Sequence, residues 1–232
     1  KAGPNEFRII SEQESDRAFQ LRPAWLPRLR AQRLVESFDD AGRFPPGLAG
    51  MTGDAERRSG RWGNFGPPGP VPDGQRAHSA PQSVRLVAAG RSLHGYVLGD
   101  VTDGRDWELE LWLWRDEGAG LDVVAKGRTP AVALEAELLV AEDGAVRIRD
   151  LAAGSWLDTG LQVPPAVWTC LRLIARRAWP DCYVTVTPDG GAEQSSEVHA
   201  PLQVRSDLYL VEMSALGAGA VHVDDVALLE RL

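Results

Sequence analysis

The sequence predicts an all-β fold, either a sandwich or a barrel. Residues 83–229 contain many short segments rich in β-branched and aromatic side chains, and no long segment with the 3.6-residue period of a helix. Dipeptides that favour tight turns separate these segments: Asp103-Gly104, Asp143-Gly144 and Asp189-Gly190, the last followed by Gly191. Many short strands without helices are typical of sandwiches and barrels.

The predicted strands divide the chain into two parts. Residues 1–33 are expected to be an N-terminal extension or linker that packs on the sandwich, and residues 34–232 a single β-sandwich domain. Within it, residues 40–81 are rich in Pro and Gly and are expected to form a long loop. The strands are predicted at Leu34–Asp39, Ser83–Ala88, Leu93–Asp100, Asp106–Arg115, Leu121–Lys126, Val132–Val140, Val146–Asp150, Trp156–Asp158, Trp168–Ala175, Cys182–Thr187, Glu197–Pro201, Leu208–Met213 and Val221–Leu229.

Composition limits the kinds of partner. The chain has 232 residues, 44% hydrophobic and 25% charged, which is an ordinary globular balance. Its net charge of -8 disfavours nucleic acid, because an acidic surface repels phosphate backbones. No run approaches the ~18 apolar residues of a membrane helix, so no membrane insertion is expected. Because the chain begins at Lys1 and not at Met, we expect a processed chain or a piece of a larger protein.

The segment Asp106–Arg115 alternates with period two over ten residues and therefore has two chemically different faces. One face is apolar and is predicted to lie on the core: Trp107, Leu109, Leu111 and Leu113. The other face combines two carboxylates with two indoles: Glu108, Glu110, Trp112 and Trp114. A core face should lack carboxylates and a solvated face should be mostly polar. The second face is therefore predicted to bind a ligand or to be covered by another part of the chain.

Three segments resemble the concanavalin A-like (laminin G-like) jelly-roll superfamily. Leu34–Asp39 resembles its opening strand, and Val163–Val186 its hairpin, with a Trp at the start of one strand and Tyr-x-Val along the next. Val221–Leu229 resembles its closing strand, which contains Asp-Asp-Val. The resemblance implies a two-sheet antiparallel β-sandwich whose ligands lie on the concave sheet or on loops at one edge. The galactose-binding-like jelly rolls of carbohydrate-binding modules end in a similar strand and are the alternative.

Glu108 and Glu110 are the candidate catalytic pair. Residues two apart on a strand have Cα atoms about 6.7 Å apart, within the roughly 5–9.5 Å that glycosidase carboxylates use. The related jelly-roll glucanases carry Glu-x-Asp-x-x-Glu, whereas this chain has Glu110 at the middle position and Leu113 at the last. The alternative is that both glutamates pair with an arginine across the sheet, at position 147, 149 or 172.

The aromatic side chains Trp112 and Trp114 are the candidate sugar platform, because indole faces give sugars a flat apolar surface. The alternative is that the N-terminal extension or the Pro-rich loop covers them. Trp62, within that loop, is a further candidate for ligand contact, or an anchor of the loop on the sandwich.

A structural calcium ion is implied by the resemblance, since related proteins often hold one where the opening and closing strands meet. The candidate ligands are Asp39, Asp40, Asp224 and Asp225. The alternative is that Asp224 and Asp225 hydrogen-bond to turns and strand ends. The two cysteines, Cys170 and Cys182, are expected either to form a disulfide between neighbouring strands or to be two reduced thiols.

Three functions follow from these observations. The favoured one is a non-catalytic carbohydrate-binding or accessory module of a multidomain, polysaccharide-processing protein, extracellular or periplasmic, with a polysaccharide or oligosaccharide as its partner. The second is a glycoside hydrolase or polysaccharide lyase that uses Glu108 and Glu110. The third is a structural or protein-interaction domain whose aromatic face is buried by its own N-terminal extension.

Overall fold

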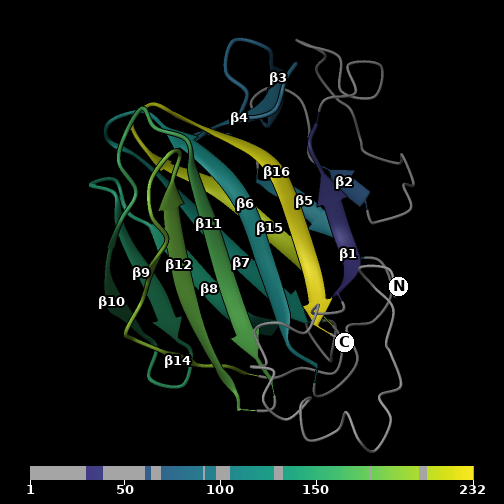
Figure 1. Cartoon of the computed structure of the whole chain (residues 1–232), viewed down its shortest axis with the longest axis vertical. Coiled ribbons are helices and arrows are strands. Elements are labelled where there is room, and N and C mark those ends of the chain that lie inside the picture. The colour runs from purple at the N-terminus through teal and green to yellow at the C-terminus, as the bar shows by residue number, and fades with distance from the viewer. Residues whose placement is uncertain are drawn as a thin grey trace, which may run out of the picture.

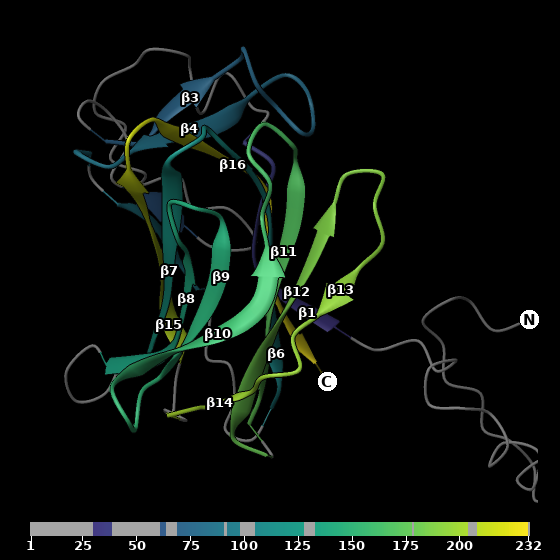
Figure 2. The same cartoon turned by 90° about the vertical axis from the view of Figure 1, so that its left-hand side faces the viewer.

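The computed structural model describes residues 30–38, 61–63, 69–90, 92–97, 105–127, 133–177, 179–203 and 208–231. These residues form two antiparallel sheets that pack face to face, and they include no helix (Figures 1 and 2). The predicted all-β sandwich is therefore confirmed. Within the same residues, no helical segment is long and apolar enough to cross a membrane.

The first sheet has nine strands and faces the viewer in Figure 1. Its order is β13-β12-β11-β6-β16-β4-β3, with β1 paired to β16 and β14 paired to β12. The strands are β1 (Arg30–Glu36), β3 (Val71–Asp73), β4 (Ser83–Val87), β6 (Trp107–Arg115), β11 (Thr169–Arg176), β12 (Asp181–Pro188), β13 (Gln194–Ser195), β14 (Ala200–Pro201) and β16 (Ala220–Arg231).

The second sheet has seven strands in the order β10-β9-β8-β7-β15-β5-β2 and lies behind the first in Figure 1. Its strands are β2 (Arg61–Gly63), β5 (Leu93–Tyr96), β7 (Ala119–Gly127), β8 (Ala133–Val140), β9 (Ala145–Asp150), β10 (Ser155–Gln162) and β15 (Leu208–Gly217).

Some strand bounds differ from the predicted ones. The first strand covers 30–36 instead of 34–39, and the predicted strand at 197–201 is replaced by the two short strands β13 and β14. The predicted loop at 40–81 contains β2 and β3. Pro72 is tolerated in β3 because that strand is at the edge of its sheet, where a missing N–H removes no ladder bond. Strands of two or three residues give no periodic signal, so they could not be found from the sequence.

The core lies between the sheets and confirms the predicted inner face of β6. Trp107, Leu109, Leu111 and Leu113 are at most 1% exposed. In register with them lie Leu171 on β11 and Val223 on β16, which are both fully buried. At about 1.5–3 kcal/mol for each fully buried large apolar side chain, this row contributes strongly to holding the sheets together.

A buried ion pair joins the two sheets at one end of β6. The Arg177 guanidinium donates to both carboxylate oxygens of Glu135, at 2.8 and 2.7 Å, and both side chains are fully buried. Glu135 lies on β8 of the seven-stranded sheet and also accepts a 2.8 Å hydrogen bond from the Trp107 indole on β6 of the other sheet. A buried charge is stable only when it is paired and hydrogen-bonded, as it is here.

A second buried cation, Arg115, orders the turns at the other end of β6. Its guanidinium donates to the backbone carbonyls of Val163, Ala119 and Glu142 at 2.9–3.0 Å. Gly144 lies so close that a Cβ there would be 2.4 Å from Arg115 Nη2, and its φ of 89° also favours glycine. Burial lowers the pKa of Arg115, opposed by the nearby charges of Asp143 and Glu117.

Cys170 and Cys182 are two buried, unbridged thiols. Cys170 pairs with Thr187 and lies on the side of β11 away from the core, whereas Cys182 pairs with Ala175 and belongs to the core. The two side chains point to opposite faces of the sheet, which decides the alternative that the sequence left open. Burial raises the pKa of each thiol to about 12.

Candidate functional site

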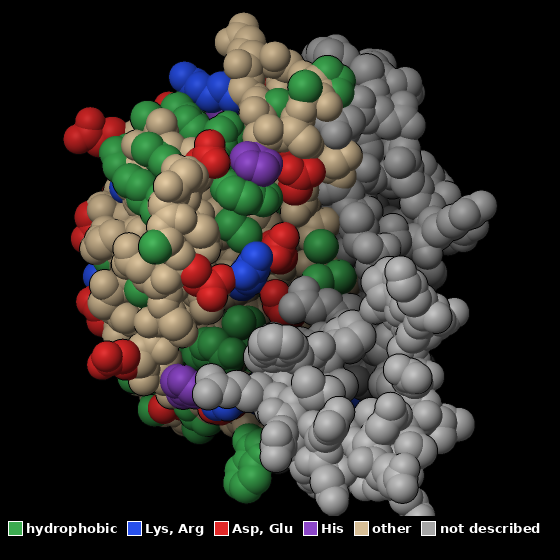
Figure 3. Space-filling view, viewed as in Figure 1, with side chains coloured by type: hydrophobic (Ala, Val, Ile, Leu, Met, Phe, Trp, Pro, Cys, Tyr) green, Lys and Arg blue, Asp and Glu red, His purple; other side chains and the backbone are tan. Residues whose placement is uncertain are grey.

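The candidate site is the surface of the nine-stranded sheet that points away from the core, hereafter the outer face. β6 contributes Glu108, Glu110, Trp112 and Trp114, as its alternation predicts. Glu108 is only 2% exposed, and the other three are half-buried. Figure 3 shows histidines toward two ends of this face and acidic and basic side chains gathered between them.

Four charged side chains form the centre of the outer face, hereafter the Arg172 cluster: Arg172, Glu108, Glu110 and Glu193. Arg172 lies directly opposite Glu110 in the register of β11 and β6. Its Nε is 2.7 Å from Glu110 and 3.7 Å from Glu108, and its Nη1 is 2.6 Å from Glu193. Burial acts to lower the pKa of Arg172, but the hydrogen bond and charge of Glu110 outweigh it and raise that pKa.

In this geometry both members of the candidate catalytic pair contact an arginine. Glu108 and Glu110 share one guanidinium, so the interaction with Arg172 foreseen as the alternative is present. Arg147 and Arg149 lie on β9 of the other sheet and do not take part. A general acid must reach the substrate, whereas the side chain of Glu108 is only 3% exposed. Arg172 holds the partly exposed carboxylates of Glu110 and Glu193, which can accept hydrogen bonds from a ligand.

An aromatic cluster lies next to the Arg172 cluster, hereafter the Trp112 cluster: Trp112, His78 and Trp168. The His78 imidazole stacks on Trp112, with ring centroids 3.6 Å apart and an interplanar angle of 12°. It meets Trp168 edge-on at 5.8 Å. The neighbouring Trp114 is covered by the Arg76 guanidinium, 3.9 Å from the ring centroid. Residues 76–78 of the predicted Pro-rich loop therefore cover the indoles, which was one of the two alternatives for this face.

Two aspartates of β16 hold this loop on the sheet. Asp224 Oδ2 accepts hydrogen bonds from the backbone N–H groups of His78 and Ser79, at 2.9 and 3.1 Å. Asp225 lies 2.7 Å from His78 Nδ1 and accepts a 2.9 Å hydrogen bond from the Ser79 hydroxyl. Asp225 has a φ of 45°, at the break in the register between β16 and β6. The two aspartates hydrogen-bond to a turn, as the alternative to calcium binding expects.

The same contacts test the calcium prediction. Calcium takes six to eight oxygen ligands, whereas N–H and O–H donors face the oxygens of Asp224 and Asp225. Among the residues described, no group of three or more His, Cys, Asp or Glu side chains could hold a metal. Asp224 and Asp225, the two candidate ligands that the structure describes, therefore do not fit a calcium ion. The other two candidates, Asp39 and Asp40, lie outside the described residues.

Burial raises the pKa of Asp224 to about 7, aided by the neighbouring charge of Asp225 and opposed by the backbone hydrogen bonds. From about pH 4 to 7 the folded carboxyl therefore keeps a proton that the unfolded chain has released. The free energy of unfolding therefore falls as pH rises through this window.

Asp224→Asn removes this titration. The stability of the variant, measured relative to the parent protein at the same pH, should therefore rise by a few kcal/mol between pH 4 and 7. Urea unfolding at each pH measures the difference, and Asp189→Asn in an exposed turn is the control. A pH-independent difference would contradict the assignment.

His222 lies directly opposite Trp114 in the register of β16 and β6, with ring centroids 5.5 Å apart, and is fully buried. Burial lowers its pKa to about 4. Ser83 and Asp73 both approach the same ring nitrogen, Nδ1, at 3.4 and 3.7 Å, and the Ser83 hydroxyl donates to the Arg76 carbonyl. A catalytic triad needs the serine and the acid on opposite nitrogens. This trio therefore does not have the geometry of a catalytic triad.

A second aromatic pair lies beyond the Arg172 cluster, hereafter the Tyr183 pair: Tyr183 and His199. Their rings stack at 5.0 Å with an interplanar angle of 16°, and the Arg176 guanidinium lies 5.4 Å from the Tyr183 centroid. Asp181 contacts both Arg176 and His199. The hydrogen bonds to these two partners outweigh burial and lower the pKa of Asp181. Along the outer face, aromatic groups thus lie on both sides of the Arg172 cluster.

The structure brings together only part of the predicted ligand set. Glu108, Glu110, Trp112 and Trp114 share the outer face, but Trp62 lies on β2 of the seven-stranded sheet, opposite Gly95. His78, Trp168, Tyr183 and His199 were not singled out as ligand contacts from the sequence. For Tyr183 and Trp168 a signal existed, since each alternates with core residues on the predicted hairpin.

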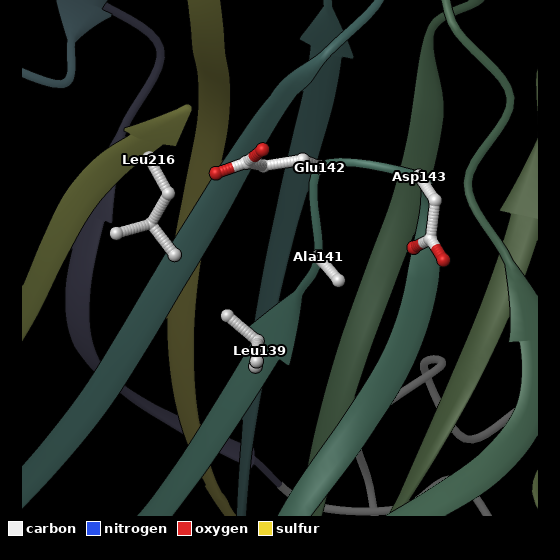
Figure 4. Close-up of a pocket in the computed structure, with 5 residues that line it drawn as sticks. All are labelled: Leu139, Ala141, Glu142, Asp143 and Leu216. Carbon is white, nitrogen blue, oxygen red and sulfur yellow. The ribbon is translucent and has the colours of Figure 1, made fainter. Parts of the chain in front are cut away.

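A pocket of about 400 Å³ lies on the far side of the molecule, on the outer side of the seven-stranded sheet. Its lining comprises Leu139, Ala141, Glu142, Asp143 and Leu216. Glu142 extends toward Leu216, whereas Asp143 points away from the leucines (Figure 4). The pocket has no aromatic ring in its lining, so the outer face of the nine-stranded sheet is the better candidate for a sugar.

No family model and no curated protein matches this sequence. Among solved structures, peanut lectin with a nine-residue peptide is similar, with a TM-score of 0.51 and 8% identity over 88% of this chain and 98% of the lectin. A sialidase is similar with a TM-score of 0.50 and 7% identity, over 72% of this chain and 16% of the sialidase. These likenesses confirm the concanavalin A-like jelly-roll fold that the sequence motifs indicated.

Proposed function

We propose that the chain is a non-catalytic carbohydrate-binding module and that its outer face binds an oligosaccharide. The observation that carries the proposal is the order of groups along this face. The Trp112 cluster and the Tyr183 pair lie on either side of the Arg172 cluster. Sugar rings combine apolar faces, which stack on aromatic rings, with hydroxyl groups, which need acceptors and donors such as Glu110, Glu193 and Arg172.

The size of the surface favours a chain of sugars over a single ring. Trp168 immediately precedes β11 and is four residues from Arg172, about 13 Å along an extended chain. β12 with Tyr183 lies one strand further, about 4.8 Å away. A ligand that contacts both aromatic groups must therefore extend over several rings. The fold's likeness to a lectin supports the proposal, and its likeness to one part of a sialidase supports a place within a larger protein. We propose that this larger protein is extracellular or periplasmic and processes polysaccharides.

Calorimetric titration with neutral, amine-bearing and uronic-acid oligosaccharides tests the proposal. We expect Trp168→Ala and Tyr183→Ala each to weaken binding about tenfold, which corresponds to about 1.4 kcal/mol for each lost stacking platform. The matched control is Trp156→Ala. Trp156 lies on β10 of the other sheet, with the Arg149 guanidinium 5.0 Å from its ring centroid. Its replacement should therefore leave the affinity for the oligosaccharide unchanged. No binding by any of the three classes, or equal losses in all variants, would overturn the proposal.

A further inference from the structure

The Arg172 cluster carries more negative than positive charge. One guanidinium contacts three carboxylates, so the cluster has a formal charge of minus two. Glu110 and Glu193 each use one oxygen, Oε2, on Arg172. Their side chains are 26% and 48% exposed, so solvent or a ligand can reach them. A second cation therefore has acceptors here, and its charge would reduce the repulsion among the three carboxylates.

A buried hydroxyl lies at the same place. Thr185 is directly opposite Arg172 in the register of β12 and β11, and opposite Ser195 in the register of β12 and β13. The ion pair of Arg172 with Glu193, which immediately precedes β13, therefore crosses β12 next to Thr185. Thr185 is 3% exposed, and its Oγ1 has no hydrogen-bond partner among the described residues. Leaving such a group unsatisfied is unfavourable by about 1–3 kcal/mol.

We infer that the Arg172 cluster is a subsite for the primary ammonium group of an amine-bearing sugar. This inference rests on the proposed function and specifies its ligand class. A primary ammonium has three N–H donors and no acceptor. Glu110 and Glu193 supply two carboxylate acceptors that solvent reaches, and the unsatisfied Thr185 hydroxyl lies on the same face in register with Arg172. The neighbouring rings of the same oligosaccharide pack on the His78 and Trp168 rings of the Trp112 cluster and on the Tyr183 pair.

The same geometry argues against uronic acids. An anionic sugar needs a cation with free donors, whereas two of the Arg172 nitrogens are already bonded to Glu110 and Glu193. The remaining carboxylates would repel a second anion. The sequence-wide charge of -8 acts in the same direction over longer range.

The test compares three defined probes: oligomers of glucosamine, of N-acetylglucosamine and of galacturonic acid. We expect the glucosamine oligomer to bind about tenfold more tightly than its acetylated form, and the galacturonic acid oligomer not to bind. Glu193→Gln should weaken glucosamine binding about fivefold more than it weakens binding of the acetylated form, because only the free amine loses a charge partner. Glu197→Gln, an exposed position four residues away, is the matched control and should change neither. The affinity for glucosamine should also fall as salt is raised.

The outcomes separate this inference from the proposed function. If the free-amine and acetylated oligomers bind equally well and both depend on Trp168, the carbohydrate module stands and the ammonium subsite is wrong. The same conclusion follows if Glu193→Gln and Glu197→Gln behave alike. If none of the three probes nor any neutral oligosaccharide binds, the proposed function is overturned, and this inference with it.

Discussion

Arg177→Met is expected to lower the free energy of unfolding by about 3–5 kcal/mol, the range for removing one partner of a buried ion pair. The substitution leaves the carboxylate of Glu135 fully buried, with the Trp107 indole as its one remaining donor among the described residues. Because this group connects β6 of one sheet with β8 of the other, the loss affects the packing of the whole sandwich. Denaturant unfolding followed by tryptophan fluorescence measures the change.

The adjacent residue provides the control for this prediction. Arg176 also pairs with a carboxylate, that of Asp181, but its side chain is 37% exposed. Arg176→Met should therefore change stability by less than about 1 kcal/mol, as exposed ion pairs do. The double change Arg177→Met with Glu135→Leu should recover part of the lost stability, because no unpaired buried charge remains. Equal effects of the two arginine substitutions would contradict the role assigned to the buried pair.

Arg115→Met is expected to lower the free energy of unfolding by about 2–4 kcal/mol. The carbonyls of Val163, Ala119 and Glu142 would lose the guanidinium as a donor. The first two of these hydrogen bonds are buried, and leaving a buried carbonyl unsatisfied costs about 1–3 kcal/mol before water re-enters. The three turns that meet at this guanidinium should also exchange their amide protons faster. Hydrogen exchange of the backbone amides of Gly144 and Val163 reports this local loosening.

Arg147→Met is the matched control for this second prediction. Arg147 lies half-buried on β9, on the outer side of the seven-stranded sheet, and its replacement should stay within about 0.5 kcal/mol. A change at Arg115 no larger than that at Arg147 would show that the carbonyl contacts do not hold the turns together.

The sequence was sufficient for the architecture and for one strand of the site. The alternation in Asp106–Arg115 placed four side chains in the core and four on the outer face, because a period of two leaves no other arrangement in a buried strand. The Trp and Tyr-x-Val pattern placed the β11–β12 hairpin. Both predictions depend on local repetition, which a single sequence displays directly.

The rest of the site depends on contacts between residues far apart in the chain. His78 reaches Asp225 across 147 positions, and Arg177 reaches Glu135 across 42. Neither pairing has a spacing that could reveal it. The cover over Trp112 and Trp114 was foreseen as an alternative, but the residues that provide it, Arg76 and His78, lie in a segment whose composition indicates only a loop. The geometry of the Arg172 cluster likewise requires the register of β6, β11 and β12.

Mapping a bound oligosaccharide by nuclear magnetic resonance tests the central claim most directly, namely that the outer face of the nine-stranded sheet is the ligand surface. As a glucosamine oligomer is titrated, the indole N–H of Trp168 and the Nε–H of Arg172 should shift in a saturable manner. The indole N–H of Trp156, on the other sheet, should not move. Shifts confined to Trp156 and to the amides around Leu139 and Glu142 would instead place the ligand in the pocket of the seven-stranded sheet and contradict the account.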